Sequence, residues 1–334
     1  MDNKKNSTQY LYLEGRKVGI IGVSIKEGQD LEGPEVAPDH LRKAGLHEVI
    51  NSLDWEYQDY LNIEDNNLKI DTGNVDEYKY KNLKHSLKIG AACKNLYSYV
   101  RKMAEAGQFS LILGGDHGIA TGSISALKSV YPDLKIIWID AHADCNIPEE
   151  SPSGNYHGMP VAHLFGWIEQ NTVPGFDWFK PCLKKEDFVF IGLRSIDKGE
   201  RVSLKKHGIK YYTMHEVTKY GIGAVLKEAV EYLSKDEKNS PIHLSFDIDA
   251  IDPAFAYGTG TRARGGLSYR EALYIVKEVA DSGRLVGLDL VEINPLIDRP
   301  REHFHGDSQF IKEASETVSL GLELIGCALG EKFI

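Results

Sequence analysis

The chain has 334 residues, a formal net charge of -10 and four cysteines. Hydrophobic residues make up 42% and charged residues 26%, which is typical of a globular protein and excludes a disordered one. The acidic balance disfavours nucleic acid and anionic membrane surfaces as partners and suits a cationic substrate. The cysteines lie far apart with no C-x-x-C pair, which indicates free thiols rather than a disulfide framework or a zinc ribbon.

The N-terminus is polar and lacks the apolar core of a signal peptide. No apolar run approaches the roughly 20 residues that a membrane-spanning helix needs. We therefore expect a cytoplasmic protein without a membrane partner.

Along the chain, short apolar runs that predict strands alternate with helical patterns. Several strand candidates are apolar at both odd and even positions, as expected when both faces of a parallel sheet are covered. Ser268 and Glu271 form a capping box, which predicts the start of a helix. The predicted strands are 18–23, 110–113, 134–139, 187–193, 242–246 and 285–290, and the predicted helices are 83–106, 117–130, 221–235, 268–283 and 308–328.

Residues 63–78 and 297–308 are polar and irregular, so we expect loops there. The alternation of strands and helices predicts an α/β protein with three layers (α/β/α) and a mainly parallel central sheet. No repeat or long linker divides the chain, so residues 1–334 are expected to form a single domain.

Three predicted strands end in segments rich in aspartate and histidine. These segments are G-G-D-H at 114–117, D-A-H-A-D at 140–144 and D-I-D-A-I-D-P at 247–253. Ligands in such folds bind outside the carboxyl ends of the strands, and an extended backbone directs residues i, i+2 and i+4 to one face. We therefore expect the side chains of these segments to converge.

Several carboxylates in one place repel one another unless divalent cations neutralise them. If Asp140 and Asp247 each bridge, two metals receive four protein ligands apiece, with room for a shared water or hydroxide. The oxygen-rich set favours Mn²⁺, although imidazole also suits zinc, cobalt and iron. The predicted ligands are His117, Asp140, His142, Asp144, Asp247 and Asp249.

These three segments resemble the signatures of the ureohydrolases, the arginase and agmatinase superfamily, and the resemblance extends from residue 18 to the final helix. It implies a fold of the arginase and deacetylase type and two Mn²⁺ ions per subunit. The first ion would be held by His117, Asp140, Asp144 and Asp247, and the second by Asp140, His142, Asp247 and Asp249.

The segment S-G-N-Y-H-G at 153–158 resembles the arginase form of the substrate site. The resemblance implies that Ser153, Asn155 and Asn146 bind the α-carboxylate of L-arginine, and that His157 shuttles a proton.

Further substrate contacts follow from the same resemblance. Asp197 would bind the substrate α-ammonium directly, and Glu200 would support it. Glu292, at the end of the last strand, would bind the guanidinium, whose planar fork fits a carboxylate. Asp144 would orient the attacking hydroxide, and the retained Thr261 is assigned to the substrate site.

Some positions depart from the family pattern. Arg262-Ala263-Arg264 stands where the family has proline after the threonine, which should loosen the loop; we expect both arginines to face solvent or a neighbouring subunit. Ser195 stands where an aspartate is frequent, Gly118 where serine is common, and Ala37 where glycine is common.

The expected activity is hydrolysis of L-arginine to L-ornithine and urea, in a homotrimer. Two alternatives stay open: a ureohydrolase for agmatine or another guanidino compound, and a non-catalytic arginase-like protein. A deacetylase-like enzyme would have no reason to carry S-G-N-x-H-G together with Glu292. The cluster of His303, His305 and Asp307 resembles a metal site but follows the last strand, and His163 and His243 are expected to be structural.

Overall fold

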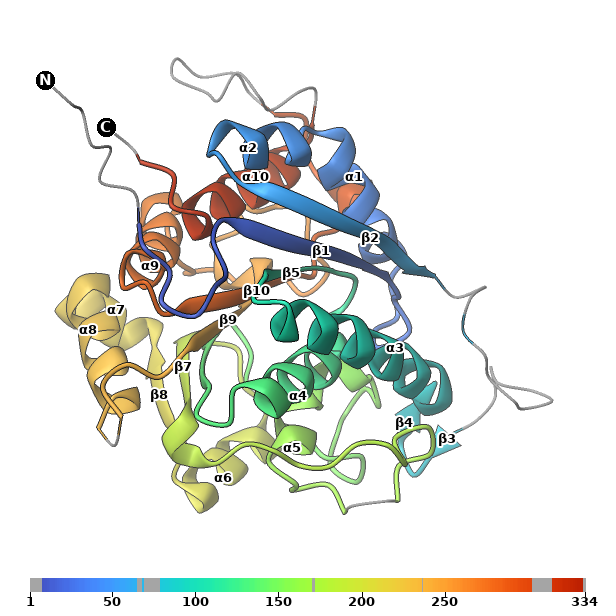
Figure 1. Cartoon of the computed structure of the whole chain (residues 1–334). Helices are drawn as coiled ribbons and strands as arrows, with labels where there is room; N and C mark the ends of the chain where they lie inside the picture. The colour runs from blue at the N-terminus through green and yellow to red at the C-terminus, as the bar shows by residue number, and fades with distance from the viewer. Residues whose placement is uncertain are drawn as a thin grey trace, which may run out of the picture.

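An eight-stranded parallel sheet forms the centre of the protein (Figure 1). The computed structural model describes residues 8–64, 68, 79–169, 172–235, 237–301 and 314–332. The strand order is β2-β1-β5-β10-β9-β6-β7-β8, and every neighbouring pair is parallel. The strands are β1 (Lys17–Ser24), β2 (Glu56–Glu64), β5 (Phe109–Gly114), β6 (Lys135–Ile139), β7 (Phe188–Leu193), β8 (Lys210–Thr213), β9 (Ile242–Asp247) and β10 (Leu285–Val291).

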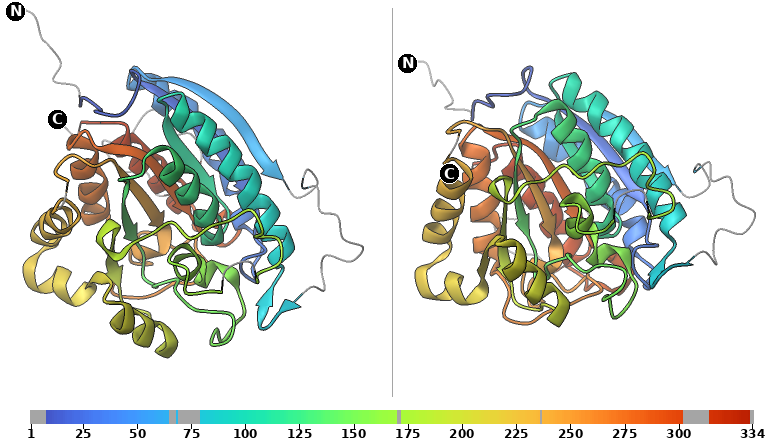
Figure 2. Two further views of the ribbon diagram at one scale, coloured as in Figure 1. Left: turned by 60° about the horizontal axis from the view of Figure 1, so that its bottom comes forward. Right: turned by 90° about the horizontal axis from the view of Figure 1, so that it is seen from below.

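Helices cover both faces of this sheet, so the predicted three-layer α/β/α architecture is confirmed (Figures 1 and 2). Neighbouring strand residues pack on opposite faces, as Leu111 and Ile112 do in β5, which is why the strands are apolar at both parities. One face carries α1 (Ala37–Lys43), α2 (Leu46–Ser52), α7 (Met214–Tyr220), α8 (Ile222–Leu233), α9 (Tyr269–Asp281) and α10 (Glu316–Ala328). The other face carries α3 (Ser86–Glu105), α4 (Ala120–Val130), α5 (Pro160–Leu164) and α6 (Lys198–His207).

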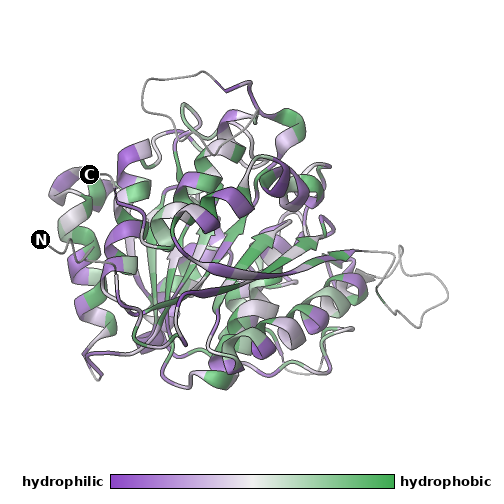
Figure 3. Cartoon of the chain, turned by 45° about the horizontal axis from the view of Figure 1, so that its top comes forward, coloured by the Kyte–Doolittle hydropathy of each residue, from purple (hydrophilic) through white to green (hydrophobic). Residues whose placement is uncertain are grey.

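The remaining elements are short. An antiparallel pair, β3 (Lys79–Tyr80) and β4 (Leu83–Lys84), lies outside the main sheet. The single-turn 3₁₀ helices are η1 (Pro34–Val36), η4 (His117–Ile119), η5 (Tyr156–Gly158), η6 (Lys185–Asp187), η7 (Ile248–Ala250) and η8 (Pro295–Ile297). Hydrophobic residues concentrate on the central strands, and hydrophilic residues on the outward helix faces (Figure 3).

All six predicted strands are confirmed, and so is the capping box of Ser268 and Glu271 at the start of α9. The two edge strands, β2 and β8, were not predicted, because an edge strand is partly exposed and does not need a continuous apolar run. The short helices α1, α2, α5, α6 and α7 were not predicted either. Most of the two predicted loops, the start of the helix predicted at 308 and the cluster of His303, His305 and Asp307 lie outside the described residues.

The order of the strands decides where the conspicuous segments meet. The central strands β5, β10, β9 and β6 are consecutive in the sheet, although their order in the chain is different. Because they are parallel, their carboxyl ends share one edge, and each of the four is followed by one of the predicted site segments. Among the described residues, no helix combines the length and the hydrophobicity needed to cross a bilayer.

Candidate metal centre and active site

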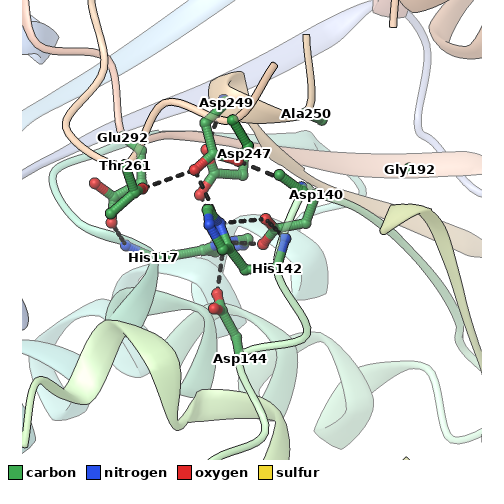
Figure 4. Close-up of polar contacts among 12 residues, drawn as sticks. His117, Asp140, His142, Asp144, Gly192, Asp247, Asp249, Ala250, Thr261 and Glu292 are labelled. Carbon is green, nitrogen blue, oxygen red and sulfur yellow. Dashed lines mark hydrogen bonds and ion pairs between the residues drawn. The ribbon is translucent and has the colours of Figure 1, made fainter. Parts of the chain in front are cut away.

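The first half of the candidate metal centre surrounds His117, which follows β5 (Figure 4). Its Nδ1 lies 3.2 Å from Asp140 Oδ2, 3.2 Å from Asp144 Oδ2 and 3.3 Å from Asp247 Oδ2. The ring stacks on Trp138 with centroids 4.0 Å apart. His117 and its three carboxylate neighbours are buried, so the group is shielded from solvent.

The second half shares Asp140 with the first. His142 Nδ1 lies 3.4 Å from Asp140 Oδ1 and 3.1 Å from Asp249 Oδ2. The two oxygens of Asp140 therefore face the two histidines separately, an arrangement that suits a bridging carboxylate. Asp247 is less symmetric, because its Oδ2 faces His117 while its Oδ1 accepts a hydrogen bond from the Asp249 N–H at 2.8 Å.

Turns, rather than an extended backbone, direct these side chains. Asp140 Oδ1 accepts the His142 N–H at 2.7 Å, and the equivalent Asp247–Asp249 bond opens η7. Asp144 is in the left-handed region, with φ 47°. The expectation that period-two alternation aligns the D-A-H-A-D side chains is therefore wrong, because β6 ends at Ile139 and each first aspartate bonds its own backbone two residues on.

The residues present fit divalent cations. Burial and the charges of Asp249 and Asp140 raise the pKa of Asp247 well above its usual value. Burial and the charge of Asp140 raise the pKa of Asp144 to about 8. His117 Nδ1 faces three carboxylate oxygens yet has no hydrogen-bond partner of good geometry. Cations at this position would relieve the repulsion and use the orphaned nitrogen as a ligand.

Two overlapping groups of side chains are close enough to hold one ion each. Ligand atoms of His117, Asp140 and Asp247 all lie within 4.8 Å of one another, and so do those of Asp140, His142 and Asp249. Thr261, from the predicted substrate site, donates its hydroxyl to Asp249 Oδ2 at 2.7 Å. All six predicted ligands therefore meet at the edge of the sheet.

Glu292 and His157 form a contact beside this cluster. Glu292 directly follows β10, has φ 62° and is buried. Its Oε1 accepts the His117 N–H at 2.9 Å and lies 3.0 Å from His157 Nδ1. Burial disfavours both charges, but the charge of Glu292 raises the pKa of His157 to about 9, and that of His157 lowers the pKa of Glu292. The sequence predicts the substrate guanidinium as the cationic partner of Glu292; within the chain itself, His157 also lies beside this carboxylate.

The residues expected to bind the α-carboxylate and the α-ammonium of the substrate lie in the segments after β6 and β7. Asn146 Nδ2 donates to Asp197 Oδ2 at 3.0 Å, so the structure brings these two together. Asn146 Oδ1 is buried without a hydrogen-bond partner. Asp197 is exposed at the start of α6, whereas Glu200 is buried, with Oε2 accepting the Asp197 N–H at 2.8 Å and Oε1 accepting the Cys145 N–H at 3.1 Å. Glu200 therefore connects the start of α6 to the loop that carries Asp144 by hydrogen bonds.

Asn155 lies between two opposite charges. Its Nδ2 donates to Asp30 Oδ2 at 3.1 Å, and its Oδ1 accepts from Lys84 Nζ at 3.0 Å. Ser153 is exposed, and its hydroxyl oxygen accepts the Asn155 N–H at 3.2 Å. Neither Asp30 nor Lys84 is part of a motif, so their sequence context carries no signal of this contact.

The departures from the family pattern have local explanations. Arg262 Nε donates to the Tyr257 carbonyl at 2.6 Å, and its guanidinium lies 3.8 Å from the centre of the Tyr257 ring. Arg262 and Arg264 are both exposed, as expected. A Cβ at Gly118 would lie 2.8 Å from the Tyr156 ring, so a side chain at this position would need the tyrosine to move.

Two further residues, Arg194 and Asp116, support the site although the sequence did not predict a role for them. Arg194 Nη2 donates to the carbonyls of Asp249 and Ala263 at 2.6 and 2.8 Å, and so ties the loop after β9 to the Thr261 loop. Asp116 accepts the Gly28 N–H at 3.0 Å, and the Gly28 carbonyl in turn accepts the His157 N–H. Asp116 lies inside the G-G-D-H segment at 114–117, which was the sequence signal available for it. Fold and site together define the class: a three-layer α/β protein whose central strand ends carry a His/Asp cluster able to hold metal.

Known proteins identify the family. The Arginase family model matches residues 16–329. An arginase of Plasmodium berghei is 43% identical over 335 residues, covering 95% of this chain and 94% of that protein. A solved arginase of Bacillus caldovelox matches with a TM-score of 0.83 at 34% identity, covering 96% of this chain and 100% of that chain. An Entamoeba histolytica arginase solved in complex with L-ornithine matches with a TM-score of 0.80 at 28% identity, covering 97% and 100%. This chain belongs to the arginase family and is a hydrolase of the amidino C–N bond.

Proposed function

We propose that this chain hydrolyses L-arginine to L-ornithine and urea with two Mn²⁺ ions. The observation that carries the proposal is the pair of ligand groups sharing Asp140, one around His117 and one around His142. The identity to named arginases and the bound L-ornithine of the Entamoeba histolytica structure support this substrate. The ions would be held by His117, Asp140, Asp144 and Asp247, and by Asp140, His142, Asp247 and Asp249.

When bound, the ions would supply a nucleophile at neutral pH and electrostatic stabilisation of the transition state. Glu292 would bind the guanidinium and hold its carbon in place, because a buried carboxylate pairs well with a planar cation. Asp144 would accept a hydrogen bond from the attacking oxygen. His157, charged beside Glu292, would donate its proton to the leaving amine.

The α-amino acid end of the substrate would be bound by neutral and acidic side chains. Asn146, Ser153 and Asn155 would bind the α-carboxylate, and Asp197 the α-ammonium, while Glu200 keeps Asp197 in position. Thr261 would instead support the metal-binding end of the site through its hydrogen bond to Asp249. The Asn146–Asp197 contact supports the assignment, because it places a donor and an anion side by side, as a zwitterionic head group requires.

We further propose that residues 1–334 act as one ureohydrolase domain, in the cytoplasm and as a homotrimer. The resemblance to arginases supports the trimer. The net charge of -10 supports a cationic small-molecule partner over nucleic acid or an anionic membrane.

Urea release from L-arginine and from agmatine, with and without Mn²⁺, tests the proposal. We expect Mn²⁺-loaded protein to release urea from arginine in clear preference to agmatine, and chelated protein to be inactive. Asp249→Ala should lower metal occupancy in elemental analysis. Equal hydrolysis of agmatine would indicate the other ureohydrolase activity, and a loaded protein that hydrolyses no guanidino compound would indicate a non-catalytic role.

A further inference from the structure

A carboxylate of the protein itself lies against Asn155, one of the residues expected to bind the substrate α-carboxylate. Asp30 Oδ1 and Oδ2 lie 2.9 and 3.1 Å from Lys84 Nζ, and Asn155 Nδ2 donates to Asp30 Oδ2 at 3.1 Å. Lys84 Nζ also donates to Asn155 Oδ1 at 3.0 Å. Lys84 and Asn155 therefore form a pair of donors that already holds one carboxylate.

Lys84 reaches this position from the β3–β4 pair, which is bonded to the segment after β6. The Lys84 N–H donates to the Gly154 carbonyl at 3.0 Å, and Asn82 Nδ2 donates to the Ser151 carbonyl at 2.6 Å. A Cβ at Gly154 would overlap the Asn82 carbonyl oxygen, so glycine is required for this close approach. These backbone contacts place the ammonium group of Lys84 beside Asn155.

Asp30 lies on a loop that is held on both sides of it. On one side the Gly28 carbonyl accepts the His157 N–H at 3.0 Å, and on the other the Glu32 carbonyl accepts from Asn294 Nδ2 at 2.7 Å. The Asp30 side chain between these contacts is 63% exposed. It can therefore turn into solvent while the loop stays in place.

Lys84 supplies a positive charge that the other residues expected at the α-carboxylate lack. Ser153, Asn155 and Asn146 are neutral, and a hydrogen bond from a charged donor to a carboxylate is roughly twice as strong as one between neutral groups. The hydrogen bonds from Lys84 and Asn155 lower the pKa of Asp30 below its usual value, so Asp30 is ionised at neutral pH. Asp30 is thus the same kind of anion as the substrate α-carboxylate and occupies the same donors.

We propose that Lys84 and Asn155 together bind the α-carboxylate of the substrate, and that Asp30 is an internal carboxylate which the substrate displaces. The inference rests on the proposed function, because it adds two residues to the same amino-acid site. Lys84 is then a specificity-determining residue, since a guanidino compound without a carboxylate gains nothing from its charge. Asp30 has the opposite effect, because it competes for the same donors.

Binding of L-ornithine to Mn²⁺-loaded protein tests the proposal without turnover, with L-ornithinamide as the ligand in which a neutral amide replaces the carboxylate. Lys84→Gln removes the charge but keeps an amide that can donate to Asn155. In isothermal titration calorimetry we expect it to weaken L-ornithine binding about tenfold, the lower end for loss of a hydrogen bond to a charged group. Binding of L-ornithinamide should not change, and Lys84→Arg, which keeps the charge, should retain most of the affinity for L-ornithine.

Asp30→Asn should instead strengthen L-ornithine binding. The variant keeps the shape of the side chain but removes the competing charge, and because an exposed ion pair contributes little, we expect a gain of only about 2–5-fold. Glu32→Gln is the matched control, since Glu32 lies on the same loop but pairs with Lys26 at 2.8 Å. It should leave the affinities for both ligands at wild-type values.

The two variants separate competition from a structural role. If Asp30 only held Asn155 in place, Asp30→Asn would bind L-ornithine more weakly, so weaker or unchanged binding would overturn the proposal. Wild-type affinity in Lys84→Gln, or an equal loss for L-ornithinamide, would also overturn it. Wild-type protein that binds no L-ornithine would contradict the proposed substrate itself, which distinguishes failure of the proposed function from failure of this inference.

Discussion

Asp144 and Glu292 are non-glycine residues with left-handed backbones, φ 47° and 62°, and both lie in the candidate site. Such conformations cost about 1–3 kcal/mol each and persist only where surrounding contacts hold them. Here the Glu292 carboxylate is held by the His117 N–H, and the Asp144 carboxylate faces the His117 ring. The backbone strain is therefore located where side chains must leave the strand ends at an unusual angle.

At the scale of single residues, His157→Asn tests whether His157 donates the proton to the leaving amine. Asparagine keeps a polar group beside Glu292 but cannot carry the charge. We expect kcat to fall roughly 10²–10⁴-fold, the usual range for loss of a general acid, with Mn²⁺ content unchanged. Steady-state kinetics and elemental analysis measure the two quantities. His207→Asn, at the C-terminal end of α6 and stacked on Trp167, should change neither quantity. An undiminished kcat in His157→Asn would remove the assigned role.

At the scale of elements, the loops after β7 and β9 are joined by one side chain. The Arg194 guanidinium donates to the carbonyls of Asp249, Ala250 and Ala263 at 2.6, 3.0 and 2.8 Å. These hydrogen bonds hold the loop that carries Ala263 against the turn that carries Asp249.

Arg194→Met should therefore loosen both loops. Hydrogen bonds to a charged group contribute about 1.5–3 kcal/mol, so we expect a lower denaturation midpoint and faster proteolysis within 258–266. Weaker Mn²⁺ binding should accompany this, since Asp249 is on the same loop. Arg201→Met, which removes an exposed arginine bonded to the Ile196 carbonyl, is the control. Equal protease resistance of the two variants would show that the Arg194 hydrogen bonds do not stabilise these loops.

At the scale of the whole molecule, a buried cluster of one aspartate and two lysines joins three elements. Asp187, just before β7, lies 2.8 Å from Lys128 of α4 and 2.6 Å from Lys135 of β6. Burial opposes ionisation, but hydrogen bonds from the two lysines lower the pKa of Asp187 below its usual value. Because the folded pKa is the lower one, this stabilisation is present above the unfolded pKa and is lost as the pH falls through the folded value.

Asp187→Asn should thus destabilise the fold at neutral pH by about 3 kcal/mol, since two buried ammonium groups lose their counter-charge. Urea denaturation of metal-free protein at pH 7 and at about pH 3 would measure the difference. The difference in the free energy of unfolding between wild type and variant should be smaller at the acidic pH. If this difference did not depend on pH, the charge of the Asp187 carboxylate would not contribute to stability.

Metal removal is the second test at this scale. Without cations, the buried carboxylates around His117 and His142 repel one another. A ligand present at a hundred times its dissociation constant stabilises a fold by about 2.7 kcal/mol per site. We expect chelated protein to melt at a lower temperature than Mn²⁺-loaded protein, and Asp249→Ala to show a smaller difference between the two states. Identical melting curves for the wild type would contradict a metal site.

The sequence alone determined the six central strands, the fold class and all six candidate ligands, because apolar runs and dense aspartate–histidine segments are local signals. The tertiary structure decided what depends on contacts between distant segments. It made β2 and β8 edge strands, for which exposure removes the apolar pattern, and it replaced extended strand ends by turns at Asp140 and Asp247. It also joined Asp289 to Ser245, and Arg194 to Ala263, since hydrogen bonds between strands and loops follow from strand order and register, which no single segment encodes.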